Sequence, residues 1–65
     1  NRLFGLMLKH TDKIGLGIDE NMAVAITDAN KVEVFGPTQV MKVRAKSNQL
    51  ILDLYKDTEI FYLNN

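Results

Sequence analysis

Two adjacent carboxylates, Asp19 and Glu20, stand where their type and position could do chemistry in this 65-residue chain. They directly follow the stretch Gly15-Leu16-Gly17-Ile18, and an apolar run begins again at Met22. A carboxylate in such a place can orient a histidine, ligate a metal or hold the backbone of a turn. The elements on either side decide which of these roles is open.

A dinucleotide site is the first possibility, because Gly15-Leu16-Gly17 matches the start of a phosphate-binding fingerprint. That fingerprint needs a third glycine three positions later, and the residue there is Glu20. A carboxylate would repel a pyrophosphate, and the residues that follow are strand-like. A nucleotide site would need a helix N-terminus there. We therefore expect no nucleotide cofactor.

A metal site is the second possibility, with Asp12 or Asp28 joining Asp19 and Glu20. The spacing of these acids matches no calcium-binding loop. One histidine and no cysteine are too few for a structural zinc site. Neighbouring acids in a turn are more often solvated or bound to the backbone, so we expect no metal.

Three further groups of residues are weaker candidates. Lys42, Arg44 and Lys46 alternate along a strand, and we interpret them as a solvated or edge-protecting face, because no aromatic residue interleaves for base stacking. His10 is expected at the end of a helix. Ser47 is the only serine and lies in a polar turn without a nucleophile-elbow sequence. The chain thus carries no complete hydrolytic centre.

Periodicity predicts one helix before the carboxylates and a strand that leads into them. Residues 1–10 have apolar residues at helical spacing, whereas residues 14–18 alternate with period two. Gly15 and Gly17 lie on one side of that strand and would let a helix or another backbone approach closely. If the alternation continues, Asp19 lies on the glycine side and Glu20 on the Ile18 side.

The rest of the chain is predicted to form β-hairpins. Strands are expected at residues 22–27, 31–35, 40–46, 50–55 and 59–63. Turns are expected at 28–30, 47–49 and 56–57, and Gly36-Pro37 breaks the chain. The predicted class is α/β, with one short helix followed by β-rich hairpins.

Size and composition limit the partners that the chain can have. A chain of this length has a core that supplies roughly 3–5 kcal/mol, and without cysteines it has no disulfides. It begins at Asn1 without an initiator methionine, so we expect residues 1–65 to be a segment of a larger protein.

Eight basic and eight acidic residues balance, and no apolar run approaches the ~20 residues of a membrane span. We therefore expect no nucleic acid and no membrane, and the lack of cysteine fits a cytoplasmic location.

Several stretches share a pattern with a known family. They are Asn1–Leu8 (NRLFGLML), Gly15–Glu20 (GLGIDE), Asn21–Ile26 (NMAVAI) and Val32–Gly36 (VEVFG). In this order they resemble the cyanophycinase and aspartyl dipeptidase (peptidase E) family of serine peptidases. The resemblance covers roughly the first 36 residues, and the remaining 29 share only a β-rich character.

The resemblance implies a fold and a reaction. It implies that residues 1–65 are the C-terminal part of a three-layer α/β fold related to class I glutamine amidotransferases. The family's catalytic serine and histidine would lie upstream of Asn1, and Glu20 matches the acid of its Ser-His-Glu triad. The implied activity is hydrolysis of peptide or isopeptide bonds next to aspartate, with a peptide as substrate and the rest of the same protein as partner.

Within this resemblance, Asp19 would be structural and the glycines would bring neighbouring elements close to the strand that delivers Glu20. Met22 departs from the pattern, since the family often has threonine there. An alternative stays open: a non-catalytic β-rich binding or scaffold module, or an inactive relative. A homo-oligomer is compatible with either hypothesis.

Overall fold

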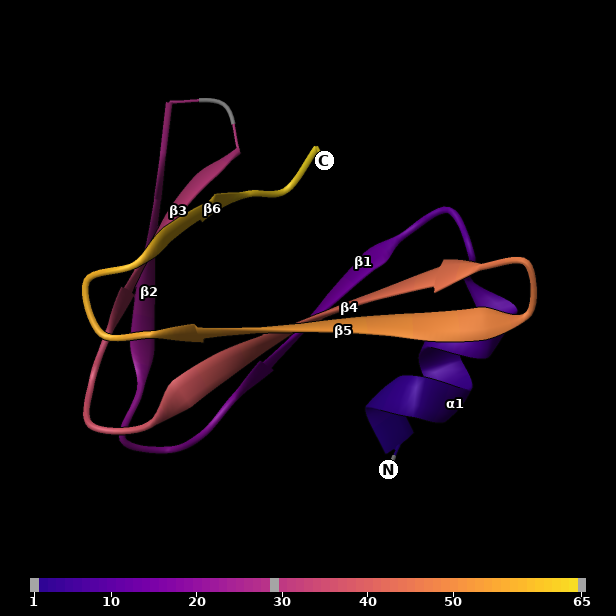
Figure 1. The fold of residues 1–65 in the computed structure, drawn as a ribbon, viewed down its shortest axis with the longest axis horizontal. Helices are drawn as coiled ribbons and strands as arrows, with labels where there is room; N and C mark the ends of the chain where they lie inside the picture. The colour runs from indigo at the N-terminus through magenta and orange to yellow at the C-terminus, as the bar shows by residue number, and fades with distance from the viewer. Residues whose placement is uncertain (1, 29, 65) are drawn as a thin grey trace.

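A computed structural model describes residues 2–28 and 30–64 and shows a small domain with one N-terminal helix and six strands (Figure 1). The elements are α1 (Arg2–Lys9), β1 (Ile14–Ile18), β2 (Ala23–Thr27), β3 (Lys31–Phe35), β4 (Gln39–Lys46), β5 (Gln49–Lys56) and β6 (Ile60–Tyr62). Strands β1, β4 and β5 form one sheet in the order β1-β4-β5, called sheet A below. Strands β2, β3 and β6 form sheet B in the order β2-β3-β6. Every pairing is antiparallel.

The predicted helix followed by hairpins is confirmed, and no element end differs from its predicted position by more than one residue. Strand β5 begins at Gln49, which the sequence had placed in a turn, and β6 ends at Tyr62. Ala29, in the predicted turn 28–30, lies outside the described residues. Within the described part of the chain, no helix is long and apolar enough to cross a membrane.

The glycines of β1 lie under α1, as their spacing predicts. A methyl group added at Gly15 would lie 2.8 Å from Leu3 Cδ1 and 2.9 Å from Met7 Sδ. One added at Gly17 would lie 3.2 Å from Met41 Cε and 3.6 Å from Leu3 Cδ2. The missing side chains thus leave the room in which α1 packs on sheet A, and Met7 is buried there.

The hairpin between β4 and β5 has the two-residue turn Ser47-Asn48. Both residues have positive φ, 51° and 64°, as in the turn type whose twist matches that of the flanking strands. Asparagine adopts this conformation more easily than most residues, which favours the turn here. The turn fixes the register that pairs Lys46 with Gln49 and Gln39 with Lys56.

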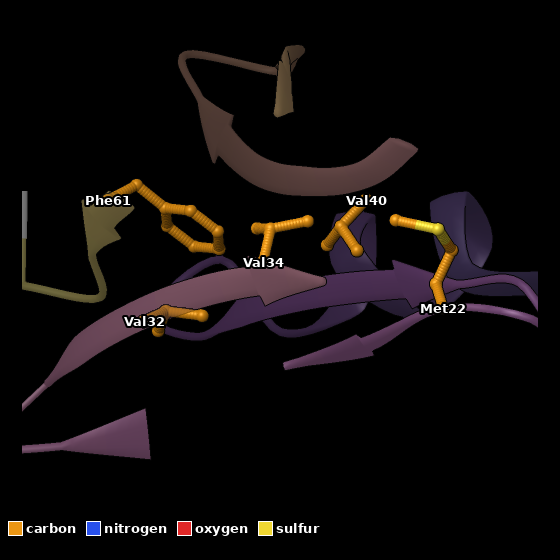
Figure 2. Packing of buried hydrophobic residues seen from close by; sticks show 5 residues of the cluster. All are labelled: Met22, Val32, Val34, Val40 and Phe61. Carbon is orange, nitrogen blue, oxygen red and sulfur yellow. The ribbon is translucent and has the colours of Figure 1, made fainter. Parts of the chain in front are cut away.

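The main core lies between the two sheets. Figure 2 shows Met22, Val32, Val34, Val40 and Phe61 packed together in this layer. Val32, Val34 and Val40 are fully buried. The ring of Tyr55 from β5 stacks on Phe61 of β6 with centroids 4.2 Å apart, so aromatic contact also joins the sheets.

The interpretation of Lys42, Arg44 and Lys46 as a solvated face is wrong for Lys42. This lysine is only 3% exposed, because its side of β4 faces sheet B. Its Nζ donates a hydrogen bond to the Tyr62 carbonyl oxygen at 2.8 Å and lies 5.7 Å from the Phe61 ring centroid. Arg44 is half-buried, and only Lys46 is exposed as expected.

Candidate functional site

The candidate site is the turn that follows β1. The strand ends at Ile18, and the Met22 N–H donates to the Asp19 carbonyl oxygen at 2.9 Å, which closes the turn. Asp19, Glu20 and Asn21 are all exposed. The alternation of β1 therefore stops before Glu20, and strand parity does not determine which way this carboxylate faces.

A hollow lies beside this turn, where β1 ends. It has a volume of about 390 Å³ and is lined by residues of α1, β1, β4 and β5. The lining residues are Leu3, Leu16, Gly17, Ile18, Asp19, Gln39, Met41 and Leu54. Most of them are apolar, and Asp19 adds a carboxylate, so the hollow adjoins the carboxylate turn.

Helix α1 runs antiparallel to β1, so its first turn lies near the end of the strand. Leu3, in the first turn of α1, reaches both Gly15 and Gly17, whereas Met7, one turn later, is among the nearest side chains only at Gly15. Figure 1 shows α1 along the side of sheet A with the chain start at its free end. The first turn of α1 therefore lies toward the end of β1 at which Asp19 and Glu20 lie.

The Glu20 carboxylate is open to an approaching group. Within residues 2–28 and 30–64 it makes no hydrogen bond or ion pair, and its side chain is exposed. A carboxylate in this state can accept a hydrogen bond from an imidazole N–H. It can also stabilise the positive charge that such an imidazole gains during catalysis.

The two other candidates for a triad lie at the opposite end of β1. His10 lies between the end of α1 and the start of β1. Its backbone N–H donates to the Leu6 carbonyl oxygen at 3.0 Å. Ser47 lies beyond Lys46 in the β4–β5 turn, at the end of sheet A where Ile14 pairs with Arg44. The structure thus brings neither of them to Glu20.

The acids considered for a metal site are also separated. Asp12 lies before β1 and pairs with Lys13 at 3.6 Å, whereas Asp28 follows the far end of β2. Across the described ranges, no three His, Cys, Asp or Glu residues are close enough to hold a metal ion.

Sequence reasoning missed the residues that complete the hollow. Met41 and Leu54 are ordinary apolar strand residues. The pairing of β1 with β4 places Met41 beside Gly17, and the pairing of β4 with β5 places Leu54 beside Met41. One signal for such residues was present in the sequence, namely that the glycine strand leaves room for side chains of another element to pack closely. No family model, curated protein or solved structure matches the chain. The assignment of the candidate site therefore depends on the geometry and the chemistry of its residues.

Proposed function

We propose that this chain supplies Glu20 as the acid of a Ser-His-Glu triad in a serine peptidase. The enzyme would hydrolyse peptide or isopeptide bonds next to aspartate, as the resemblance of Gly15–Glu20 to the cyanophycinase and peptidase E family implies. The serine and histidine would come from the same protein upstream of residue 1, and the location would be cytoplasmic.

The observation that carries the proposal is the direction of α1 on β1. In the family that the chain resembles, the catalytic histidine comes just before the helix that matches residues 1–10. Leu3 lies against both glycines of β1 and lines the hollow at Ile18 and Asp19, whereas Met7 lies against Gly15, so the start of α1 is at the same end of β1 as Glu20. A histidine in that preceding segment would approach the carboxylate that has no partner in the described residues.

The chemistry follows from the charge of Glu20. The serine hydroxyl attacks the carbonyl carbon next to aspartate, and the histidine takes the hydroxyl proton. The imidazolium then gives this proton to the leaving amine as the C–N bond breaks, and water hydrolyses the resulting acyl-enzyme. Glu20 would hold the imidazole in one tautomer by accepting its other N–H, and would stabilise the imidazolium that forms. This role requires a carboxylate that is ionised throughout the reaction.

Two exposed leucines on α1 support the view that the chain belongs to a larger three-layer fold. Leu6 and Leu8 are 53% and 52% exposed, and because they are two residues apart they project from different sides of the helix. Burying the exposed half of each leucine would contribute roughly 1 kcal/mol. We infer that the rest of the protein covers these side chains.

The test is Glu20→Gln in the protein that contains this chain. Glutamine keeps the size of the side chain but cannot stabilise the imidazolium. We expect kcat on an aspartyl peptide to fall by roughly 10³- to 10⁴-fold while KM changes little. The matched control is Asp19→Asn, one residue away, which should lower kcat by less than about threefold if Asp19 only closes the turn.

Two results would contradict the proposal. Near-normal turnover by the Glu20→Gln protein would remove Glu20 from the triad. Absence of any hydrolysis by the unmodified protein would favour the alternative, a non-catalytic β-rich module or an inactive relative.

A further inference from the structure

Strand β5 is an edge strand along its whole length. Sheet A has the order β1-β4-β5, and within residues 2–28 and 30–64 no strand pairs with the second edge of β5. An edge of eight residues presents a row of N–H and C=O groups that another strand can bind. Proteins that avoid such pairing usually shorten, bulge or charge their edges.

The contacts of Lys56 show which residues of β5 face this edge. Its N–H donates to Glu59 Oε1 at 2.6 Å, and its carbonyl oxygen accepts the Glu59 N–H at 2.9 Å. The backbone groups of Lys56 are therefore directed away from β4. Because orientation alternates along an antiparallel strand, Leu50, Leu52 and Leu54 also direct their N–H and C=O groups to the free edge.

The same three leucines form an apolar stripe on the α1 side of sheet A. The register places Leu52 beside Val43 and Leu54 beside Met41, which in turn lies beside Gly17. Leu52 and Leu54 are 46% and 53% exposed. Between Leu50 and Tyr55 the strand has one charged residue, Asp53, and no proline. The edge therefore combines free backbone groups with exposed apolar side chains.

We propose that β5 is an interface for a second copy of this chain, paired antiparallel to its own β5 about a two-fold axis at Leu52. The result is a continuous six-stranded sheet with both copies of α1 on the same side. The inference is independent of the proposed peptidase function, because it uses no residue of the Glu20 turn.

The charge of Asp53 selects this register. Outward-facing residues must lie opposite outward-facing residues, so the two-fold axis passes through a residue of β5. The two longest overlaps are centred on Leu52, joining residues 49–55, and on Asp53, joining residues 50–56. The second places two carboxylates directly opposite each other, which is destabilising. The first places Asp53 opposite Ile51 of the other copy.

The occupant is a second copy because the leucine stripe complements itself in this register. Leu52 lies opposite Leu52, and Leu50 lies opposite Leu54 in both directions, so each exposed leucine gains an apolar neighbour. A two-fold interface of this kind uses the same patch on both chains. Each copy of the patch is then occupied, so pairing through β5 stops at the dimer.

Cysteine cross-linking tests the register, since the chain has no cysteine of its own. Residues opposite each other in such a pair have Cα atoms about 4.5–5.5 Å apart, within the range that a disulfide spans. We expect Leu52→Cys to form a covalent dimer under mild oxidation at least about tenfold faster than Ile26→Cys. Ile26 is the matched control, because it is 56% exposed but lies on β2 of sheet B.

Two further measurements complete the test. In sedimentation equilibrium the unmodified chain should reach twice its 7.4 kDa mass with rising concentration. Leu52→Lys, which places two ammonium groups opposite each other, should stay monomeric, and Ile26→Lys should still dimerise. A mass of 7.4 kDa at every concentration, or cross-linking of Ile51→Cys, which keeps the Asp53 carboxylate, as fast as that of Leu52→Cys, would overturn the proposal.

Discussion

The two faces of sheet A bury their neighbours by opposite means. On one face Gly15 and Gly17 have no side chains, and α1 packs directly onto the strand. On the other face Lys42 extends its long side chain between the sheets and ends at the Tyr62 carbonyl oxygen. The first face depends on the absence of atoms, and the second depends on a cation that is almost completely buried.

The difference shows where each face is vulnerable. Added volume should harm the glycine face, because close-packed elements tolerate extra atoms poorly. Lost volume should harm the face toward sheet B, because a cavity removes both burial and contacts. The lysine adds a charge whose burial costs free energy, so its benefit must come from its stem and its hydrogen bond.

Phe61→Ala should have the largest effect, because it empties the layer between the sheets. Phe61 is 4% exposed, stacks on Tyr55 and lies beside the Lys42 Nζ. Truncation of a buried phenylalanine costs about 3–5 kcal/mol, which is as large as the stability expected of a domain this small. Circular dichroism in urea should show an unfolded or nearly unfolded chain, and a shift below about 1 kcal/mol would contradict this packing.

Gly15→Val should have the next largest effect, through the glycine face. Its branched side chain would overlap Leu3 and Met7, which already approach the position of an added methyl group within 3 Å. We expect a loss of about 2–3 kcal/mol in the free energy of unfolding, measured by urea denaturation.

Gly5→Ala is the control for this prediction. Gly5 lies in α1, and an added methyl group there meets nothing within 4 Å. Alanine favours the helix by roughly 0.5–1 kcal/mol, so this variant should be slightly more stable. Destabilisation of both variants to the same extent would show that α1 does not pack as described.

Two substitutions of Lys42 separate its stem from its charge. Lys42→Ala removes both and should cost about 2 kcal/mol through lost packing and the lost hydrogen bond to Tyr62. Lys42→Met keeps most of the stem and removes the buried charge, so its free energy of unfolding should lie within about 1 kcal/mol of the unmodified chain. Equal losses in the two variants would mean that the charge itself stabilises the layer.

The pH dependence of stability gives the smallest effect. Burial, with Arg44 adding to it, holds the pKa of Lys42 below its ordinary value of 10.5, whereas Asp53 opposes this shift. The folded chain therefore loses this proton at a lower pH than the unfolded chain does. Its stability should rise relative to Lys42→Met as the pH increases through the lowered pKa toward 10.5.

Tyr55 limits the pH range of that measurement. Burial, with Asp53 adding to it, raises the pKa of the Tyr55 hydroxyl above 10.0. A raised tyrosine pKa gives stability that is present below pH 10.0 and is lost above it. Urea denaturation of both chains between pH 7 and about pH 9.5 therefore isolates Lys42. A constant difference between the two chains would contradict the assigned burial.

The local elements could be predicted because their signals are local. The alternation in residues 14–18 and the helical spacing in residues 1–10 each need only neighbouring residues. The close approach at Gly15 and Gly17 was also predictable, since a glycine face has few other uses.

The arrangement of the strands could not be predicted in the same way. β1 pairs with β4, more than twenty residues along the chain, and no local pattern specifies that partner. The burial of Lys42 follows from this pairing and from the second sheet above it, so its alternation with Arg44 and Lys46 was misleading. The open position of Glu20 likewise depends on where β1 ends.

The direction of α1 on β1 is the central claim, because it places the start of the helix beside the Glu20 turn. Nuclear Overhauser effects between side-chain methyl groups and glycine α-protons measure it most directly. The account predicts contacts from the Leu3 methyls to both Gly15 and Gly17, and from the Met7 γ-protons to Gly15. Contacts from Met7 to Gly17 without any from Leu3 to Gly17 would mean that α1 runs in the opposite direction along β1, which would contradict the account.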